Sequence, residues 1–310
     1  MNHVNLISDP VFDSGLGHLS RLIAVAQEFQ LCGISYCFHP NNSFSPTHID
    51  FIVSNQLSPI CTCDEESGLS IVDSYNPRLA AGKGSSGVQN IVQFIDEITP
   101  IGAYDAIIEV SPISPSKKYP PEVPVLKFKD APLFRNEIYT VRNSQLVQPK
   151  NEEGWVLLLG GVSDYKYLEV LSILRRIGVD FCRKLTIATK SNTVVSTAKN
   201  LGFSEFCSQQ NVSYISQTFK YVISAAGVSA WEFSFVGMPG FVISVVENQE
   251  YQLKHLLDSG IRQGVSMSST HLEVEIADKI VSVNNAYKKR PLGSGRSDFI
   301  SFLRKRSLLT

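Results

Sequence analysis

The stretch YVISAAGVSAWEFSFVG, Tyr221 to Gly237, indicates the fold class of this chain of 310 residues. A β-rich run ends in small residues at Ala225 and passes directly into an apolar helical segment. Ala226 and Gly227 let backbone approach a ligand closely, and the unpaired N–H groups of a helix N-terminus favour a phosphate. The stretch therefore predicts a phosphate-binding turn after a strand of a parallel sheet.

The same stretch has a second, purely local interpretation. Ser229 and Glu232 have the Ser-x-x-Glu spacing of a capping box. In that arrangement both side chains would bond to amides of their own helix. The spacing alone does not decide between a phosphate site and a capped helix.

Strands and helices alternate on both sides of this stretch. Gly160 and Gly161 follow an apolar run and precede a helical pattern, which is a weaker form of the same signal and is commonly only a tight turn. Asn248 and Gln249 come directly after another strand, where carboxamides either bind sugar hydroxyls or serve the loop. The expected strands of this half are 154–161, 184–190, 220–227 and 238–245, and the expected helices are 167–178, 194–202, 229–237 and 248–260.

The first half repeats this pattern. A strand at 3–9 leads through glycines into a helix whose apolar face runs from Leu19 to Phe29. His18 stands at the start of this helix, where the positive end of the dipole favours the neutral imidazole that a general base needs. The alternative is a partly buried histidine that only packs. Further strand or buried segments are expected at 33–40, 49–55 and 104–112, a helix at 88–99 and a surface connection at 64–87.

These alternations predict an α/β protein with two Rossmann-like domains facing across a cleft. Proline and charge accumulate before residue 150, which places the expected boundary there. The expected parts are an N-terminal Rossmann-like domain over 1–150, a C-terminal Rossmann-like domain over 151–295, and a terminal helix over 296–310 that packs back towards the N-terminal domain.

Composition narrows the classes of function. A formal net charge of −1 gives no broad basic surface, so we expect no nucleic-acid partner and a ligand held by local geometry. The start of the chain lacks a secretory pattern and no long apolar run follows, so we expect a cytoplasmic protein without a transmembrane segment. The six cysteines are scattered, which predicts reduced thiols, no metal site and no cofactor.

Several of these segments together resemble a known family. GLGHLSRLIAVAQEF (15–29), LLLGGVSDY (157–165), KLTIATK (184–190) and the run 221–261 are similar, in order, to the UDP-sugar hydrolase of pseudaminic acid biosynthesis. The plan of the second half is also similar to the peptidoglycan N-acetylglucosaminyltransferase. Both belong to the GT-B class, so the resemblance implies a GT-B fold that binds a nucleotide-diphosphate sugar such as a UDP-sugar.

The resemblance also implies roles for single residues. His18 matches the general base, with Gly17 in the turn before it. Glu232 matches the acidic position that meets the nucleotide ribose, and Asn248 and Gln249 match a pair near the sugar. The nucleotide and diphosphate positions expected on these grounds are Gly17, Gly160, Gly161, Ala226, Gly227, Val228 and Glu232.

The first hypothesis is a nucleotide-sugar enzyme of surface polysaccharide or nonulosonic acid biosynthesis in which His18 activates water and the sugar is cleaved from UDP. The second is a glycosyltransferase in which His18 deprotonates a saccharide or other hydroxyl acceptor. The third is a non-catalytic nucleotide-sugar-binding protein, suggested by the segment EVSPIS at 109–114, which departs from the hydrolase pattern.

Overall fold

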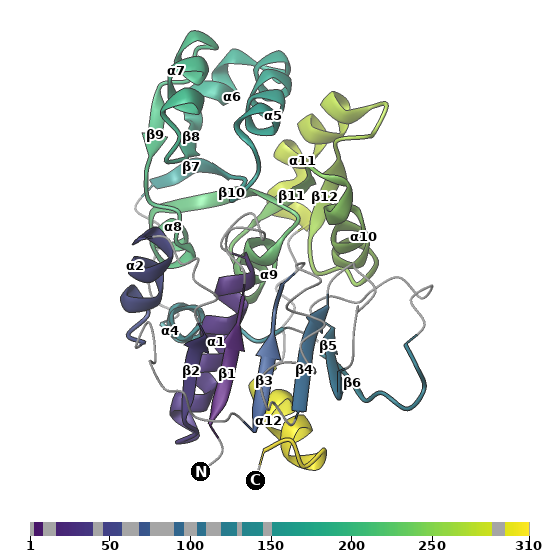
Figure 1. The fold of residues 1–310 in the computed structure, drawn as a ribbon. Coiled ribbons are helices and arrows are strands. Elements are labelled where there is room, and N and C mark those ends of the chain that lie inside the picture. The colour runs from purple at the N-terminus through teal and green to yellow at the C-terminus, as the bar shows by residue number, and fades with distance from the viewer. Residues whose placement is uncertain are drawn as a thin grey trace. The chain divides into compact units, whose positions relative to one another are not determined.

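The computed structural model describes residues 3–8, 17–39, 46–57, 68–74, 90–95, 104–109, 119–128, 132–144, 151–286 and 295–309. The chain divides into two compact units, the first formed by residues 1–136 and 292–310 and the second by residues 137–291. Each unit contains one six-stranded sheet (Figure 1). The expected α/β class with two Rossmann-like domains is therefore confirmed.

The first sheet has the strand order β2-β1-β3-β4-β5-β6, and all its pairings are parallel. Because β2 and β3 lie on opposite sides of β1, the crossovers change direction between β1 and β3. Ligands of open parallel sheets bind at the carboxyl ends of the strands at such a point. The strands are β1 (Val4–Ile7), β2 (Tyr36–His39), β3 (Leu69–Val72), β4 (Asn90–Ile95), β5 (Ala106–Glu109) and β6 (Val125–Lys127).

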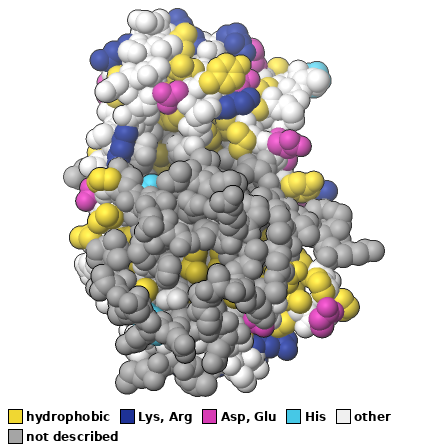
Figure 2. All heavy atoms as spheres, in the orientation of Figure 1, with side chains coloured by type: hydrophobic (Ala, Val, Ile, Leu, Met, Phe, Trp, Pro, Cys, Tyr) yellow, Lys and Arg dark blue, Asp and Glu magenta, His cyan; other side chains and the backbone are white. Residues whose placement is uncertain are grey.

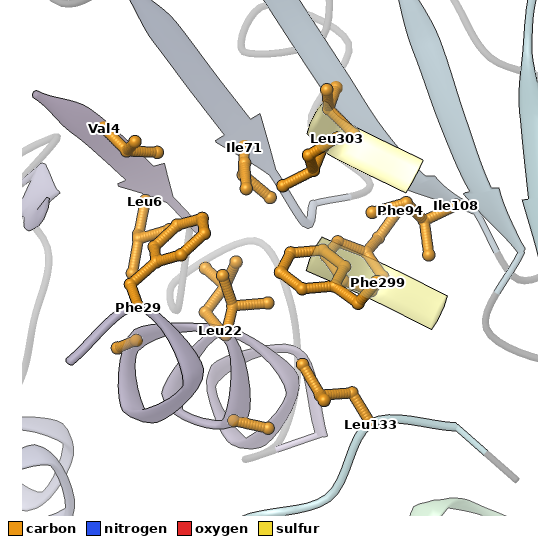
Figure 3. Packing of buried hydrophobic residues seen from close by; sticks show 14 of the residues in the cluster. Val4, Leu6, Leu22, Phe29, Ile71, Phe94, Ile108, Leu133, Phe299 and Leu303 are labelled. Atoms are coloured by element: carbon orange, nitrogen blue, oxygen red, sulfur yellow. The ribbon is translucent and has the colours of Figure 1, made fainter. Parts of the chain in front are cut away.

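Two helices far apart in the sequence share the core of this unit. Helix α1 (Gly17–Leu31) and helix α12 (Arg296–Lys305) pack against the same set of strand side chains (Figure 3). Phe299 is fully buried, and its ring centroid lies 5.8 Å from that of Phe29. Leu303 is also fully buried. The last helix of the chain is thus part of the first unit's core.

The second sheet has the order β12-β11-β10-β7-β8-β9, again with parallel pairings. Strands β8 and β10 flank β7, so the crossovers change direction between β7 and β10. The strands are β7 (Asn151–Leu158), β8 (Leu185–Ala188), β9 (Glu205–Cys207), β10 (Phe219–Ala225), β11 (Gly240–Ser244) and β12 (Gln263–Ser266).

Helices cover this sheet. The core on one side holds apolar side chains of α5, α7 and α11, while α8 and α9 contact β10. Helix α4 (Asn136–Asn143) belongs largely to this unit because Tyr139 and Arg142 both pack on the ring of Phe235 in α9. The division at residue 136 instead of 150 follows from these contacts. The helices are α5 (Asp164–Ile177), α6 (Val179–Lys184), α7 (Asn192–Asn200), α8 (Val212–Thr218), α9 (Val228–Val236), the 3-10 turn η1 (Glu247–Gln249), α10 (Glu250–Asp258) and α11 (Leu272–Ala286).

Three segments of the first unit differ from the sequence-based expectations. Residues 49–54 of the expected segment 49–55 lie in helix α2 (Pro46–Ser54), whose first residue is a proline, as is common at helix starts. The expected helix at 88–99 contains strand β4, because a short apolar run fits a buried strand and a buried helix equally well. The expected connection at 64–87 contains β3, an internal strand of the sheet.

Candidate functional site

The first candidate site lies at the direction change of the first sheet. Helix α1 follows β1 in the chain, and Asp73 directly follows β3, the neighbouring strand. The backbone N–H of Asp73 donates to the carbonyl of Ile7 over 2.9 Å and extends the strand ladder by one residue. Both segments therefore leave the carboxyl edge of the sheet side by side. This placement brings His18 and Asp73 together although 55 positions separate them.

His18, Arg21 and Asp73 form a buried cluster. His18 Nδ1 lies 2.6 Å from Asp73 Oδ1. Arg21 donates to both carboxylate oxygens, from Nε to Oδ2 over 2.6 Å and from Nη2 to Oδ1 over 2.7 Å. The side chain of His18 is 9% exposed and that of Asp73 only 2%, so the carboxylate lies more deeply than the imidazole.

The charge of Asp73 is fixed by its neighbours. Burial opposes its charged form, but the interactions with Arg21 and His18 outweigh burial and lower the pKa of Asp73 to about 2. Asp73 is thus a carboxylate near neutral pH and can only accept hydrogen bonds. Its short contact assigns the proton of a neutral His18 to Nδ1, which leaves a lone pair on Nε2. An imidazole held in this way can accept a proton at Nε2.

Sequence reasoning selected His18 but assigned no role to Asp73 or Arg21. Asp73 falls in the stretch 64–87 that was expected to be a surface connection. The available signal was the apolar run Leu69–Val72 that ends in an acidic residue. Four apolar or small residues do not reveal on their own that they form an internal strand.

The second candidate site lies in the second unit, at the turn from β10 into α9. Gly227 is the N-cap of α9, and no side chain caps this end of the helix. Ser229 lies inside the helix and not at its N-cap, so the capping-box interpretation is wrong. The first turn of α9 contains no acidic residue. Among the described residues beyond its two chain neighbours, a Cβ added to Gly227 would meet no atom within 4 Å, so the space beside this turn is open.

Gly160 and Gly161, which follow β7, have a different environment. Gly160 has φ +65°, a left-handed conformation that favours glycine, so the turn itself accounts for this residue. The following helix α5 is capped by Ser163, whose side chain accepts from the N–H of Lys166. Its first turn also carries Asp164. An anion would meet this carboxylate, so α9 is the better phosphate site of the two.

The remaining expected residues lie on or near the same edge of the second sheet. Asn248 and Gln249 belong to η1, which begins three residues after the end of β11. Gln249 Oε1 accepts from the N–H of Val245 over 2.9 Å, so half of this carboxamide holds the turn. Glu250 strengthens it by accepting from two serine hydroxyls, Ser244 and Ser266, at 2.5 Å each. Glu232 lies in α9 and is 3% exposed.

The structure brings these residues together in two groups, one in each unit. Gly17 and His18 begin α1 in the first unit. The second group, formed by Gly160, Gly161, Ala226, Gly227, Val228, Asn248 and Gln249, follows the carboxyl ends of β7, β10 and β11, three consecutive strands of the second sheet. Glu109, the first residue of the segment EVSPIS, ends β5, and the rest of that segment lies outside the described residues.

Two further observations concern metals and membranes. Within the described ranges, no three His, Cys, Asp or Glu side chains are grouped closely enough to hold a metal ion. Among the helices of the same described residues, none combines the length and apolar character needed to cross a bilayer.

Comparison with known proteins gives a fold match along the whole chain. No protein-family model matches the sequence, and no curated protein matches it either. Among solved structures, MurG of Acinetobacter baumannii aligns with a TM-score of 0.57 at 12% identity, covering 98% of this chain and 100% of that one.

Two other solved structures align over a similar share of their length. LpCGTa in complex with UDP aligns with a TM-score of 0.58 at 11% identity, covering 99% of each chain. The spinosyn rhamnosyltransferase SpnG, complexed with thymidine diphosphate, aligns with a TM-score of 0.57 at 10% identity, covering 99% of this chain and 96% of that one. The chain thus has the two-domain Rossmann-like fold of these glycosyltransferases.

Proposed function

We propose that this protein is a glycosyltransferase that uses a nucleotide-diphosphate sugar, in which His18 deprotonates the acceptor hydroxyl. The observation that carries the proposal is the buried 2.6 Å contact between His18 Nδ1 and Asp73, which leaves Nε2 as a proton acceptor. Support comes from the fold match to MurG, LpCGTa and SpnG, two of which were solved with a nucleoside diphosphate. These matches favour transfer over the hydrolysis expected first.

The chemistry assigned to the first unit is general-base catalysis. The acceptor oxygen forms a bond to the anomeric carbon of the sugar, and the bond from that carbon to the diphosphate oxygen breaks. The acceptor proton moves to His18 Nε2, and the electron pair of the broken bond leaves with the nucleoside diphosphate. Asp73 orients the imidazole and stabilises the charge that it gains.

The chemistry assigned to the second unit is stabilisation of the leaving diphosphate. Its negative charge would lie at the N-terminus of α9, at the turn of Ala226, Gly227 and Val228. The N–H groups of Ala226 and Gly227 already donate to the carbonyls of Ile243 and Ala225, so the donors to the diphosphate would be the first amides of the helix, from Val228 onward. Figure 2 shows basic and acidic side chains both present among the coloured residues of one face. An anionic donor would therefore depend on local geometry at α9 more than on a broad positive field.

UDP release from UDP-sugars tests the proposal. Release should accelerate when a panel of saccharide and phenol acceptors is added, and the product should contain the sugar joined to the acceptor. His18→Gln should lower the transfer rate by about 10²- to 10⁴-fold, the range that general-base catalysis contributes. His48→Gln, a change in α2 of the same unit, is the matched control and should keep the wild-type rate.

Two results would overturn transfer. Equal catalytic release with and without every acceptor would assign the chain to hydrolysis, with water as the group that His18 deprotonates. Tight UDP binding with no release under either condition would identify a binding protein.

A further inference from the structure

Arg21 lies in direct contact with the hydrogen-bonded nitrogen of the proposed base. It stands three positions after His18 in α1, a spacing that places both side chains on one face of the helix. Its Nη2 lies 2.9 Å from His18 Nδ1 and 2.7 Å from Asp73 Oδ1. His18 Nδ1 therefore faces a carboxylate oxygen and a guanidinium nitrogen that are also hydrogen-bonded to each other.

These two neighbours favour opposite tautomers of His18. The carboxylate accepts only, so its contact requires a proton on Nδ1. The guanidinium donates only, so a hydrogen bond from Arg21 would require the lone pair on Nδ1 and the proton on Nε2. The contact to Asp73 is shorter, 2.6 Å against 2.9 Å, and it pairs the ring N–H with an ionised carboxylate, whereas Nη2 of Arg21 already uses one of its two N–H groups on Asp73. The Nδ1–H tautomer follows.

We infer that Arg21 is a positioning residue whose effect on His18 depends on Asp73. With Asp73 present, Arg21 holds the carboxylate in a two-point contact that aims Oδ1 at Nδ1–H. With Asp73 neutralised, Arg21 becomes the group that draws the proton to the wrong nitrogen. This inference rests on the proposed function, because only the lone pair on Nε2 makes the tautomer matter for catalysis.

The isosteric change Asp73→Asn exposes this opposition. An asparagine has one side-chain oxygen, and the cationic Arg21 competes for it with two donors. The amide N–H₂ or Nη2 of Arg21 then faces Nδ1, and both are donors. We therefore expect Asp73→Asn to convert His18 to the Nε2–H tautomer. This change of tautomer should lower kcat by about 10⁴-fold, as in a triad whose histidine is held in the wrong tautomer.

Removing Arg21 from that variant should then restore activity in part. In Asp73→Asn/Arg21→Met the amide can turn its oxygen towards Nδ1–H, because no cation competes for that oxygen. A hydrogen bond to a charged group biases a tautomer population by about 10- to 100-fold, so kcat of the double variant should exceed that of Asp73→Asn by about this factor. KM for the donor should not change.

Nitrogen-15 NMR of protein labelled at histidine measures the tautomer directly, with the His18 signals assigned by their loss in His18→Gln. Wild type should show Nδ1–H, Asp73→Asn should show Nε2–H, and the double variant should contain Nδ1–H again. Circular dichroism establishes that each variant is folded, and Arg21→Met alone, which keeps Asp73, should retain Nδ1–H.

The inference is overturned if folded Asp73→Asn keeps Nδ1–H, or if the double variant has the tautomer and the kcat of Asp73→Asn. The NMR measurement needs no substrate. A chain that transfers no sugar would overturn the proposed function, while the tautomers would still decide the role of Arg21.

Discussion

Replacement of Gly227 by alanine tests whether the turn before α9 binds phosphate or has only a structural role. The backbone there has φ −121°, which alanine adopts without strain, and within the described part of the chain no atom beyond the neighbouring residues would lie within 4 Å of the added methyl. Alanine is a poorer N-cap than glycine but restricts the unfolded chain, so the free energy of unfolding should change by no more than about 1 kcal/mol. The fold should therefore survive the substitution.

A diphosphate held at this turn would meet the added methyl, which would lie in the open space beside Gly227. A diphosphate displaced from one charge-assisted hydrogen bond loses about 1.5–3 kcal/mol, which corresponds to an increase in Kd for UDP of about 10- to 100-fold. Isothermal titration with UDP and with uridine measures this effect. Only UDP binding should weaken strongly, because uridine carries no phosphate.

Gly178→Ala is the matched control for this experiment. Gly178 also has open space around its missing Cβ. It lies between α5 and α6, before the start of β8, and thus near the amino ends of the strands, whereas Gly227 lies near their carboxyl ends. Its substitution should leave UDP binding unchanged. A folded Gly227→Ala variant that binds UDP within about twofold of wild type, or that loses UDP and uridine equally, would refute the diphosphate site at α9.

Three further predictions concern the stability of the two units. The pKa of Asp73 in the folded state is about 2, below its ordinary value of 3.8. The ionised carboxylate therefore adds to the free energy of unfolding in full above pH 3.8, and this stabilisation is lost as the pH falls through 2. The difference in unfolding free energy between wild type and Asp73→Asn should accordingly shrink by about 1 kcal/mol between pH 6 and pH 3 in urea titrations. Phe299→Ala should destabilise the first unit by about 3–5 kcal/mol, because Phe299 is fully buried. Phe302→Ala should destabilise it clearly less, because Phe302 is only partly buried, and thermal unfolding of both variants measures the difference. Gly240→Ala should prevent folding of the second unit, measurable as loss of soluble protein, because its Cβ would lie 1.9 Å from the carbonyl oxygen of Val222.

The sequence predicted the second unit better than the first for a physical reason. Its central strands β7 and β10 have eight and seven residues, and its helices end in recognisable signals, such as Gly237, which caps α9 in the left-handed conformation. In the first unit, β1, β3 and β5 have four residues each. A strand of four residues carries little periodicity, which explains why the sequence predicts a connection at β3. The six-residue β4 is an apolar run that fits a buried helix as well as a buried strand.

The sequence by itself determined the parallel α/β class, the position of His18 at the start of a helix and the small residues before α9, because these features depend on neighbours along the chain. Only the tertiary structure decided what His18 contacts. Its partner Asp73 reaches it because β1 and β3 are adjacent in space, and no local pattern encodes which strands pair. The tertiary structure likewise separated the uncapped α9 from the capped α5, since a cap is a contact and not a residue type. The sequence shows His18 only as a histidine beside a glycine turn, whereas the tertiary structure places its Nδ1 against the carboxylate of Asp73 and the guanidinium of Arg21.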